Sequence, residues 1–163
     1  MLALPYHLIM SLSAVVTGGL AVVLFTMAVR AALLPLSIRA ARATHDPFAA
    51  LWPALLQFPF LVMLYRLFNS ATVDGQPNGL LDSSVLGVHL GTRFFTDPGA
   101  LVFWLVFVAL IAIAWYASRR LRGVIRILPF FTVLVAAYVP LAAGLYLITS
   151  TAWTAVERTV LSI

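Results

Sequence analysis

The sequence contains no cysteine, no lysine and few charged residues of any kind. Without cysteine, a disulfide, a thiol nucleophile and a cysteine metal site are all excluded. Charged residues make up only 9% of the chain, whereas soluble domains average about 25%. The enzyme signatures HExxH, G-x-S-x-G and the P-loop are also missing. We therefore expect neither an enzyme nor a protein that uses a metal or another cofactor.

Apolar residues dominate instead, at 63% of the chain, with a mean hydropathy of +1.07. A soluble domain cannot bury this much apolar surface. The ten basic residues are all arginine and face five acidic residues, which gives a net charge of +5. They flank the apolar runs and do not alternate with aromatics in one patch, so they favour control of membrane topology over direct binding of nucleic acid. The composition predicts a polytopic membrane protein.

The apolar runs predict an all-α fold with five membrane-spanning helices in a single domain, 1–163. Residues 1–17, interrupted by Pro5 and two serines, are typical of an outer helix that lies in the membrane interface. The last apolar run is too long for one span, and two short spans joined near Pro140 fit better than one tilted helix, although hydropathy does not decide between them. The predicted spans cover about 19–38, 48–68, 98–118, 124–139 and 140–157, with an outer loop at 69–97 and a short hairpin around LLDSSVLGVHL.

Arginine bias predicts the orientation of these spans. Arg39, Arg42 and the 119–126 cluster fall on one side, whereas the 69–97 loop contains only Arg93. The arginine-rich side of a membrane protein is normally cytoplasmic. We therefore expect the N-terminus outside and the C-terminus in the cytoplasm.

Arg30 is the most unusual residue of the first span, GLAVVLFTMAVRAALLPL. A charge at the centre of a membrane helix costs ~2.5–3.5 kcal/mol on insertion scales. If the span begins near Met10, Arg30 is only its cytoplasmic flank. Arg39 and Arg42 already supply that flank, however, and Thr26 lies one turn earlier on the same face as Arg30. The pattern favours a polar stripe that faces a water-filled cavity.

Polar residues also occur in two other spans. Gln57 lies between Pro53 and Pro59, where it could simply form a helix–helix hydrogen bond worth about 1 kcal/mol. The last span carries polar residues on one helical face, although Ser and Thr in membrane helices usually bond to backbone carbonyls. Taken together, three polar spans indicate a shared wet interior. The candidate substrate-binding residues are Arg30, Thr26, Gln57, Tyr146, Thr149 and Ser150.

Three blocks of the sequence resemble the YidC/Oxa/Alb family of membrane protein insertases, in a short bacterial form. They are VLFTMAVRAALLPLSIRAAR (23–42), PALLQFPFLVMLYRLF (53–68) and LPFFTVLVAAYVPLAAGLYLITSTAW (128–153). The resemblance implies an outer amphipathic helix and five spans around a hydrophilic groove, which opens to the cytoplasm and to lipid but is closed outside. Arg30, Thr26 and Gln57 match the groove arginine, its polar neighbour and the groove glutamine. The VPLAAGLY stretch matches the turn between the last two spans and so implies two short spans.

The chain departs from the family pattern between the first two spans. Only ATHDPFAALW separates Arg42 from Pro53, so the family's long charged helical hairpin is missing. The basic tail that some members use for ribosome contact is not seen either. The resemblance implies nascent membrane proteins and the lipid bilayer as partners. It also implies the Sec translocon and the ribosome as partners. The missing hairpin and tail argue against these two.

We therefore expect a monomeric insertase of the bacterial inner membrane that moves short polar segments of nascent membrane proteins into the bilayer through a wet groove, without nucleotide. One alternative is a small transporter or channel in which Arg30 binds an anion. The chain lacks the inverted repeat common in transporters, which counts against that function. Another alternative is a non-catalytic assembly partner of a translocon.

Overall fold

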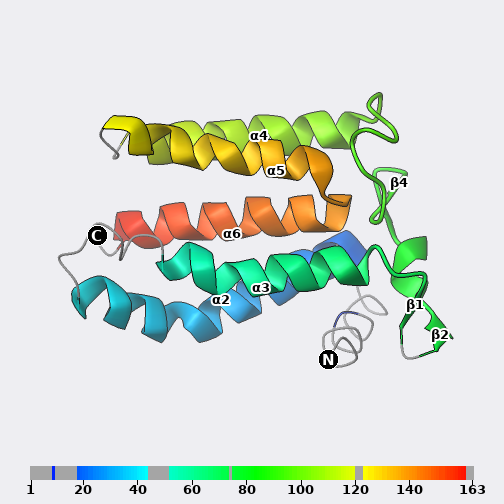
Figure 1. The fold of residues 1–163 in the computed structure, drawn as a ribbon, viewed down its shortest axis with the longest axis horizontal. Coiled ribbons are helices and arrows are strands. Elements are labelled where there is room, and N and C mark those ends of the chain that lie inside the picture. Colours follow the sequence, from blue (N-terminus) through cyan, green and yellow to red (C-terminus); the bar gives the residue numbers. More distant parts are fainter. Residues whose placement is uncertain (1–8, 10–17, 44–51, 74, 120–122, 161–163) are drawn as a thin grey trace.

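The computed structural model describes Ile9 and residues 18–43, 52–73, 75–119 and 123–160 (Figure 1). Five α-helices account for most of this part of the chain: α2 Gly18–Ala43, α3 Trp52–Leu67, α4 Leu101–Ser118, α5 Phe131–Tyr138 and α6 Leu141–Val160. The mostly helical fold and the number of α-helices agree with the sequence prediction. Except for Ile9, the predicted outer interfacial helix lies outside the described residues.

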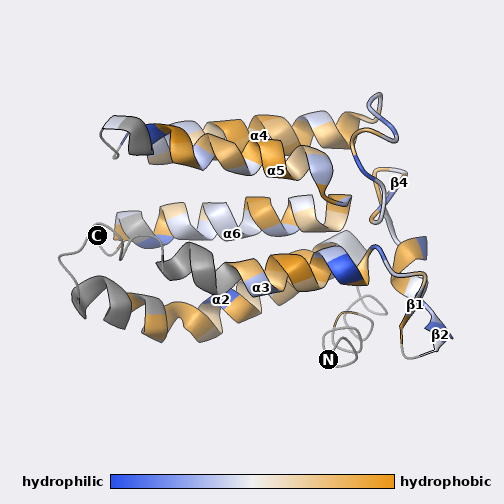
Figure 2. Ribbon diagram, viewed as in Figure 1, coloured by the Kyte–Doolittle hydropathy of each residue, from blue (hydrophilic) through white to orange (hydrophobic). Residues whose placement is uncertain are grey.

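Helix α6 lies at the centre of the arrangement and packs against α2, α3, α4 and α5 (Figure 1). The helices differ in hydropathy: α4 is hydrophobic along most of its length, whereas α6 is paler over its second half (Figure 2). The central helix is therefore more polar than a peripheral one. A helix of this kind is stable only where its neighbours supply partners for its polar groups.

Two helical segments are long and apolar enough to cross a membrane. Within the described residues they are Gly18–Leu36 and Leu101–Ser118, with mean hydropathies of 2.0 and 2.3. Two shorter apolar segments, Phe58–Leu67 and Arg126–Tyr138, fall below that length. Length and composition thus agree with membrane crossing for two of the five predicted spans, and the full five-span topology stays a prediction.

The predicted fourth span, 124–139, is wrong as a single α-helix. Its first half is a 3-10 helix, η3 Gly123–Phe130, and only the second half forms α5. Pro129 explains the change, because it has no N–H for an α-helical hydrogen bond and disfavours the α conformation at Leu128. The segment begins at Gly123, whose positive φ of 66° suits glycine.

The break near Pro140 is confirmed. Val139, directly before the proline, is extended with φ −91° and ψ 159°, as expected for a residue that precedes proline. Helix α5 ends before it and α6 begins at Leu141. The last apolar run therefore forms two helices, as the sequence favoured.

The other helices shift by a few residues from their predicted bounds. Helix α2 continues past residue 38 to Ala43. Helix α3 begins at Trp52, and residues 48–51 of the predicted span lie outside the described residues. Helix α4 begins at Leu101 because Pro98 and Gly99 form a turn before it.

The described part of the connection between α3 and α4, residues 68–73 and 75–100, contains two small hairpins. Strand β1 Thr72–Val73 pairs with β2 Gln76–Pro77, and β3 Ser84–Val85 pairs with β4 Val88–His89, both antiparallel. A short 3-10 helix, η2 Gly79–Asp82, lies between them. The β3–β4 hairpin confirms the one predicted in LLDSSVLGVHL. The all-α prediction did not include the β1–β2 pair.

This connection closes one end of the helix bundle. The Leu90 and Thr92 carbonyls accept hydrogen bonds from the first N–H groups of α6, at Ala142 (3.0 Å) and Leu141 (2.9 Å). Those N–H groups have no partner within their own helix. Gly19, at the start of α2, lies so close to β3 that an added Cβ would stand 2.2 Å from Val85 Cγ2. The hairpin region thus contacts the ends of both α2 and α6.

Candidate functional site

Arg30 lies near the middle of α2 and is almost completely buried, with 5% of its surface exposed. Its guanidinium Nη2 donates to the backbone carbonyl of Ser150 and to Thr154 Oγ1, the latter at 2.5 Å. Both acceptors belong to α6. Arg30 is therefore a group between two helices, and its burial disagrees with the alternative that it is only a cytoplasmic flank.

Helix α6 presents three polar residues at a spacing of four, Tyr146, Ser150 and Thr154, which places them on one face. Tyr146 and Ser150 are 3% and 1% exposed. The Tyr146 phenol hydrogen-bonds to the Ser150 side chain and lies in the field of the Arg30 charge. Thr154 Oγ1 in turn donates to the Ser150 carbonyl at 3.0 Å. These three residues and Arg30 form a network that we call the Arg30 cluster, in which Thr154 is half-buried and the other three are buried.

Two of the predicted residues use their hydroxyls locally. Thr26 is fully buried one turn before Arg30, and its Oγ1 donates to the Val22 carbonyl at 2.7 Å. Thr149 Oγ1 donates to the Leu145 carbonyl at 2.9 Å. Both bonds follow the ordinary pattern of Ser and Thr in membrane helices, in which the hydroxyl satisfies a carbonyl one turn earlier. Thr26 and Thr149 thus lie next to the Arg30 cluster without a hydroxyl bond to it.

Gln57 lies in α3, but its side chain is outside the described residues. Of the six predicted residues, the structure brings Arg30, Tyr146 and Ser150 together in one network and places Thr26 and Thr149 beside it. The role of Gln57 stays a prediction.

Two further polar residues of α6 were not among the predicted substrate-binding residues. Thr154 contacts Arg30 directly, and its signal was available because it follows Ser150 by four residues. Trp153, beside it, has a buried indole Nε1 with no hydrogen-bond partner among the described residues. Leaving a buried donor unsatisfied costs about 1–3 kcal/mol, so this N–H favours a polar ligand or a water nearby. No sequence pattern would have marked it.

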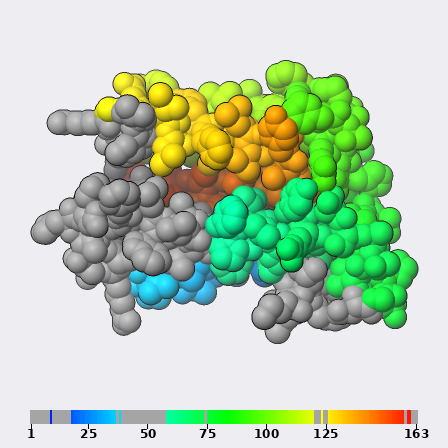
Figure 3. Space-filling model, in the orientation of Figure 1, coloured from blue at the N-terminus to red at the C-terminus, as the bar shows by residue number. Residues whose placement is uncertain are grey.

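The molecular surface is hollowed between α5 and α3, and α6 forms the floor of this hollow (Figure 3). The same helix therefore carries the Arg30 cluster and underlies the hollow. Within the described residues, no group of three His, Cys, Asp or Glu side chains is positioned to hold a metal ion.

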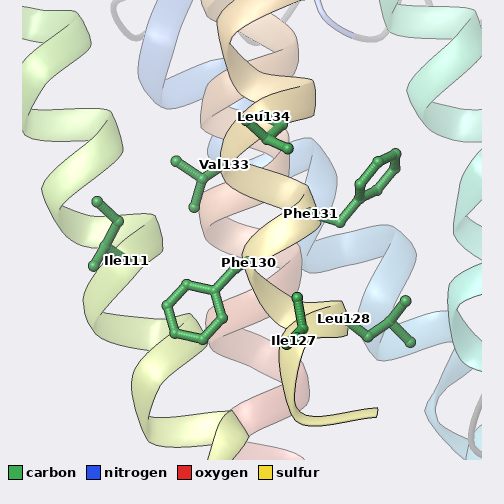
Figure 4. A pocket seen from close by; sticks show the side chains of 7 residues that line it. All are labelled: Ile111, Ile127, Leu128, Phe130, Phe131, Val133 and Leu134. Atoms are coloured by element: carbon green, nitrogen blue, oxygen red, sulfur yellow. The ribbon is translucent and has the colours of Figure 1, made fainter. Parts of the chain in front are cut away.

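A pocket with only apolar lining side chains lies over η3 and α5 (Figure 4). Its volume is about 740 Å³, and it is lined by Ile111, Ile127, Leu128, Phe130, Phe131, Val133 and Leu134. None of these residues belongs to the Arg30 cluster. The Arg30 cluster and this open apolar pocket are thus built from different side chains.

Comparisons with protein-family models, with curated proteins and with solved structures found no match to this chain. The resemblance to membrane protein insertases therefore rests on the three sequence blocks and stays a prediction.

Proposed function

We propose that this protein is a membrane protein insertase of the YidC/Oxa/Alb type, embedded in the bacterial inner membrane with its N-terminus outside and its C-terminus in the cytoplasm. In this proposal it moves short polar segments of nascent membrane proteins partway into the bilayer, without nucleotide or cofactor. Nascent chains and lipid are its partners. The missing hairpin argues that contact with the ribosome or the Sec translocon is dispensable for this step.

The observation that carries the proposal is the burial of Arg30 against polar groups of the central helix. A buried guanidinium is expensive in any apolar environment, and within membrane helices such groups usually serve function. Its guanidinium donates to a carbonyl and a hydroxyl of α6. A guanidinium can also attract an acidic group.

A substrate carboxylate near Arg30 would replace the Thr154 hydroxyl as acceptor. Charge-assisted hydrogen bonds are roughly twice as strong as neutral ones, so the exchange favours the substrate. The Tyr146 and Trp153 donors lie on the same helix and can serve neighbouring polar groups of the tail. Each such contact lowers the desolvation cost of a polar segment within the membrane.

The shape of the molecule supports a one-sided path. The 68–100 connection covers the end of the bundle where α6 begins, and its carbonyls satisfy the first N–H groups of that helix. The hollow between α3 and α5 gives lateral access to α6 (Figure 3). In the proposed reaction the substrate's own apolar helix leaves through this hollow into lipid. Partitioning of that helix supplies the free energy, which is why no nucleotide is required.

Site-specific crosslinking tests the proposed path. A photoreactive residue is introduced at Thr154, at Gln57 or at Val108, and each variant is mixed with a single-span substrate that has an acidic N-terminal tail. Val108 is the control because it is 64% exposed on α4, away from the Arg30 cluster. We expect crosslinks to the substrate tail from the first two positions and few from Val108. Labelling from Val108 alone would contradict the proposal.

A further inference from the structure

The apolar pocket over η3 and α5 shares no lining residue with the Arg30 cluster. Six of its seven lining side chains project from the η3–α5 segment; Phe130 and Val133 point toward Ile111 on α4, whereas Leu128 and Phe131 point away from it (Figure 4). Its volume of about 740 Å³ is that of a small-molecule site, for which about 300–1,000 Å³ is usual. Several of its residues are more than half exposed, among them Ile127 at 69% and Leu134 at 62%.

The lining restricts the chemistry of an occupant to hydrocarbon. None of the seven side chains carries a hydrogen-bonding group. A polar ligand would therefore give up its bonds to water and gain none, at a cost of several kcal/mol. An alkyl chain gains free energy with each methylene that it buries there.

Two exposed arginines lie at the ends of the segments that line this pocket. Arg126 directly precedes Ile127 and Leu128 in η3. On α4, Arg119 follows Ile111 and Trp115 at intervals of four residues, so the three lie along one side of that helix. The Arg119 guanidinium stacks on the Trp115 ring, 3.5 Å from its centroid. That contact holds a cation on the same side of α4 as the pocket residue.

We propose that this pocket binds one anionic phospholipid of the surrounding bilayer, with an acyl chain over η3 and α5 and its phosphate at Arg119 and Arg126. The site rests on the membrane placement in the proposed function but not on insertion. Both arginines belong to the side predicted to be cytoplasmic, where anionic lipids attract basic residues near the membrane surface. Apolar lining and paired cations together match both halves of such a lipid.

A bound lipid would also stabilise the 3-10 helix η3. Helix η3 runs for eight residues, whereas 3-10 helices rarely exceed three or four because their hydrogen bonds are poorly aligned. An acyl chain packed across Ile127, Leu128 and Phe130 stabilises this segment from the outside. The arrangement keeps Arg126 beside the chain that it recognises.

Native mass spectrometry of the full chain tests this site. The protein is released from neutral detergent micelles that contain equal amounts of phosphatidylglycerol and phosphatidylcholine with identical acyl chains. Each arginine near an anionic headgroup contributes about fivefold in affinity, so we expect one retained phosphatidylglycerol with a preference of about thirtyfold. The double variant Arg119→Gln/Arg126→Gln should lose most of that preference while the protein stays folded.

Two further variants separate the acyl chain from the headgroup. Leu134→Asn puts a polar group in the pocket and should lower the retention of both lipids equally, leaving the preference unchanged. Arg66→Gln is the matched control for charge, because Arg66 is exposed at the end of α3 on the other side of the molecule. It should change neither value.

Three results would overturn the proposal. They are equal retention of both lipids by the parent chain, an unchanged preference in the double arginine variant, and displacement of the lipid by a second copy of the chain, which would identify the pocket as a dimer contact. No insertion substrate is present in this measurement. A protein that inserts substrate without lipid preference refutes only the lipid site, and one that retains lipid but inserts nothing refutes only the proposed function.

Discussion

Arg30 and Arg119 place the same side chain in opposite environments. Arg30 is 5% exposed in the middle of α2 and donates to a carbonyl and a hydroxyl of another helix. Arg119 is exposed at the end of α4 and stacks on Trp115 of its own helix. A cation at a helix end is solvated and inexpensive, whereas a buried cation persists only with partners from its surroundings. The position of an arginine along its helix therefore indicates which one depends on partners from another helix.

The same contrast recurs at other residue types in this chain. Three residues contact a second structural element: Asn78, Gly19 and Thr154. For each, the chain offers a chemically similar residue that is exposed or bonds only within its own helix, and this residue serves as the control. Matched pairs of variants at these positions measure how much each contact contributes to stability or activity.

Asn78 should show the largest loss of stability. It is 4% exposed, its Nδ2 donates to the carbonyls of Leu67 (2.7 Å) and Ser70 (2.9 Å), and its Oδ1 accepts from Leu80 N (3.2 Å). Asn78→Ala removes three hydrogen bonds, so thermal unfolding in detergent should report about 2–4 kcal/mol of lost stability. The exposed Gln76→Ala is the control and should change stability by less than about 0.5 kcal/mol. If Asn78→Ala and Gln76→Ala lowered stability equally, the hydrogen bonds of the buried amide would have no special role.

Gly19 should come next, because an added Cβ would stand 2.2 Å from Val85 Cγ2. Overpacking of this kind costs about 1–3 kcal/mol, so Gly19→Ala should lower the unfolding temperature. The nearest atom to an added Cβ at Gly99 is 3.9 Å away, so Gly99→Ala should be nearly neutral. Val85→Ala in the same chain should restore part of the loss at position 19. A double variant no more stable than Gly19→Ala alone would refute this contact.

Thr154 should show the smallest effect on stability and a clearer one on activity. Thr154→Val removes an acceptor from Arg30, which costs about 1 kcal/mol, and should change the rate of substrate insertion severalfold. Thr151→Val is the matched control, since the Thr151 hydroxyl donates only to carbonyls of its own helix, at Leu147 and Ile148. If both valine variants insert substrate at the same rate, Thr154 has no special part in the Arg30 cluster.

Much of the helical framework followed from the sequence. Apolar runs of sufficient length predicted the helices, and Pro140 predicted the break between α5 and α6. Helical spacing predicted that Tyr146, Thr149 and Ser150 share a face. Arg30 is buried between helices, whereas the water-filled cavity predicted around it stays a prediction. These features depend on neighbours in sequence and on the local effect of proline, so one chain is enough to infer them.

Other features depend on contacts between distant segments. Hydropathy does not distinguish a 3-10 helix from an α-helix, so it does not predict η3, although Pro129 is a local signal. Asn78 looked like an ordinary loop residue, since its partners lie up to eleven residues away at the end of α3. The buried Trp153 indole and the acceptors of Arg30 on α6 became known only once the helices were packed together.

The central claim is that Arg30 acts on substrate, and one insertion measurement tests it most directly. Proteoliposomes that hold only this protein receive a small single-span substrate with an acidic tail, beside vesicles with Arg30→Ala, with Arg119→Ala and without protein. We predict that the parent and Arg119→Ala insert the substrate. For Arg30→Ala we predict a rate at least about tenfold lower, close to that of empty vesicles. A tenfold lower rate corresponds to a barrier about 1.4 kcal/mol higher in the rate-limiting step. Equal insertion by the parent and Arg30→Ala would contradict the account.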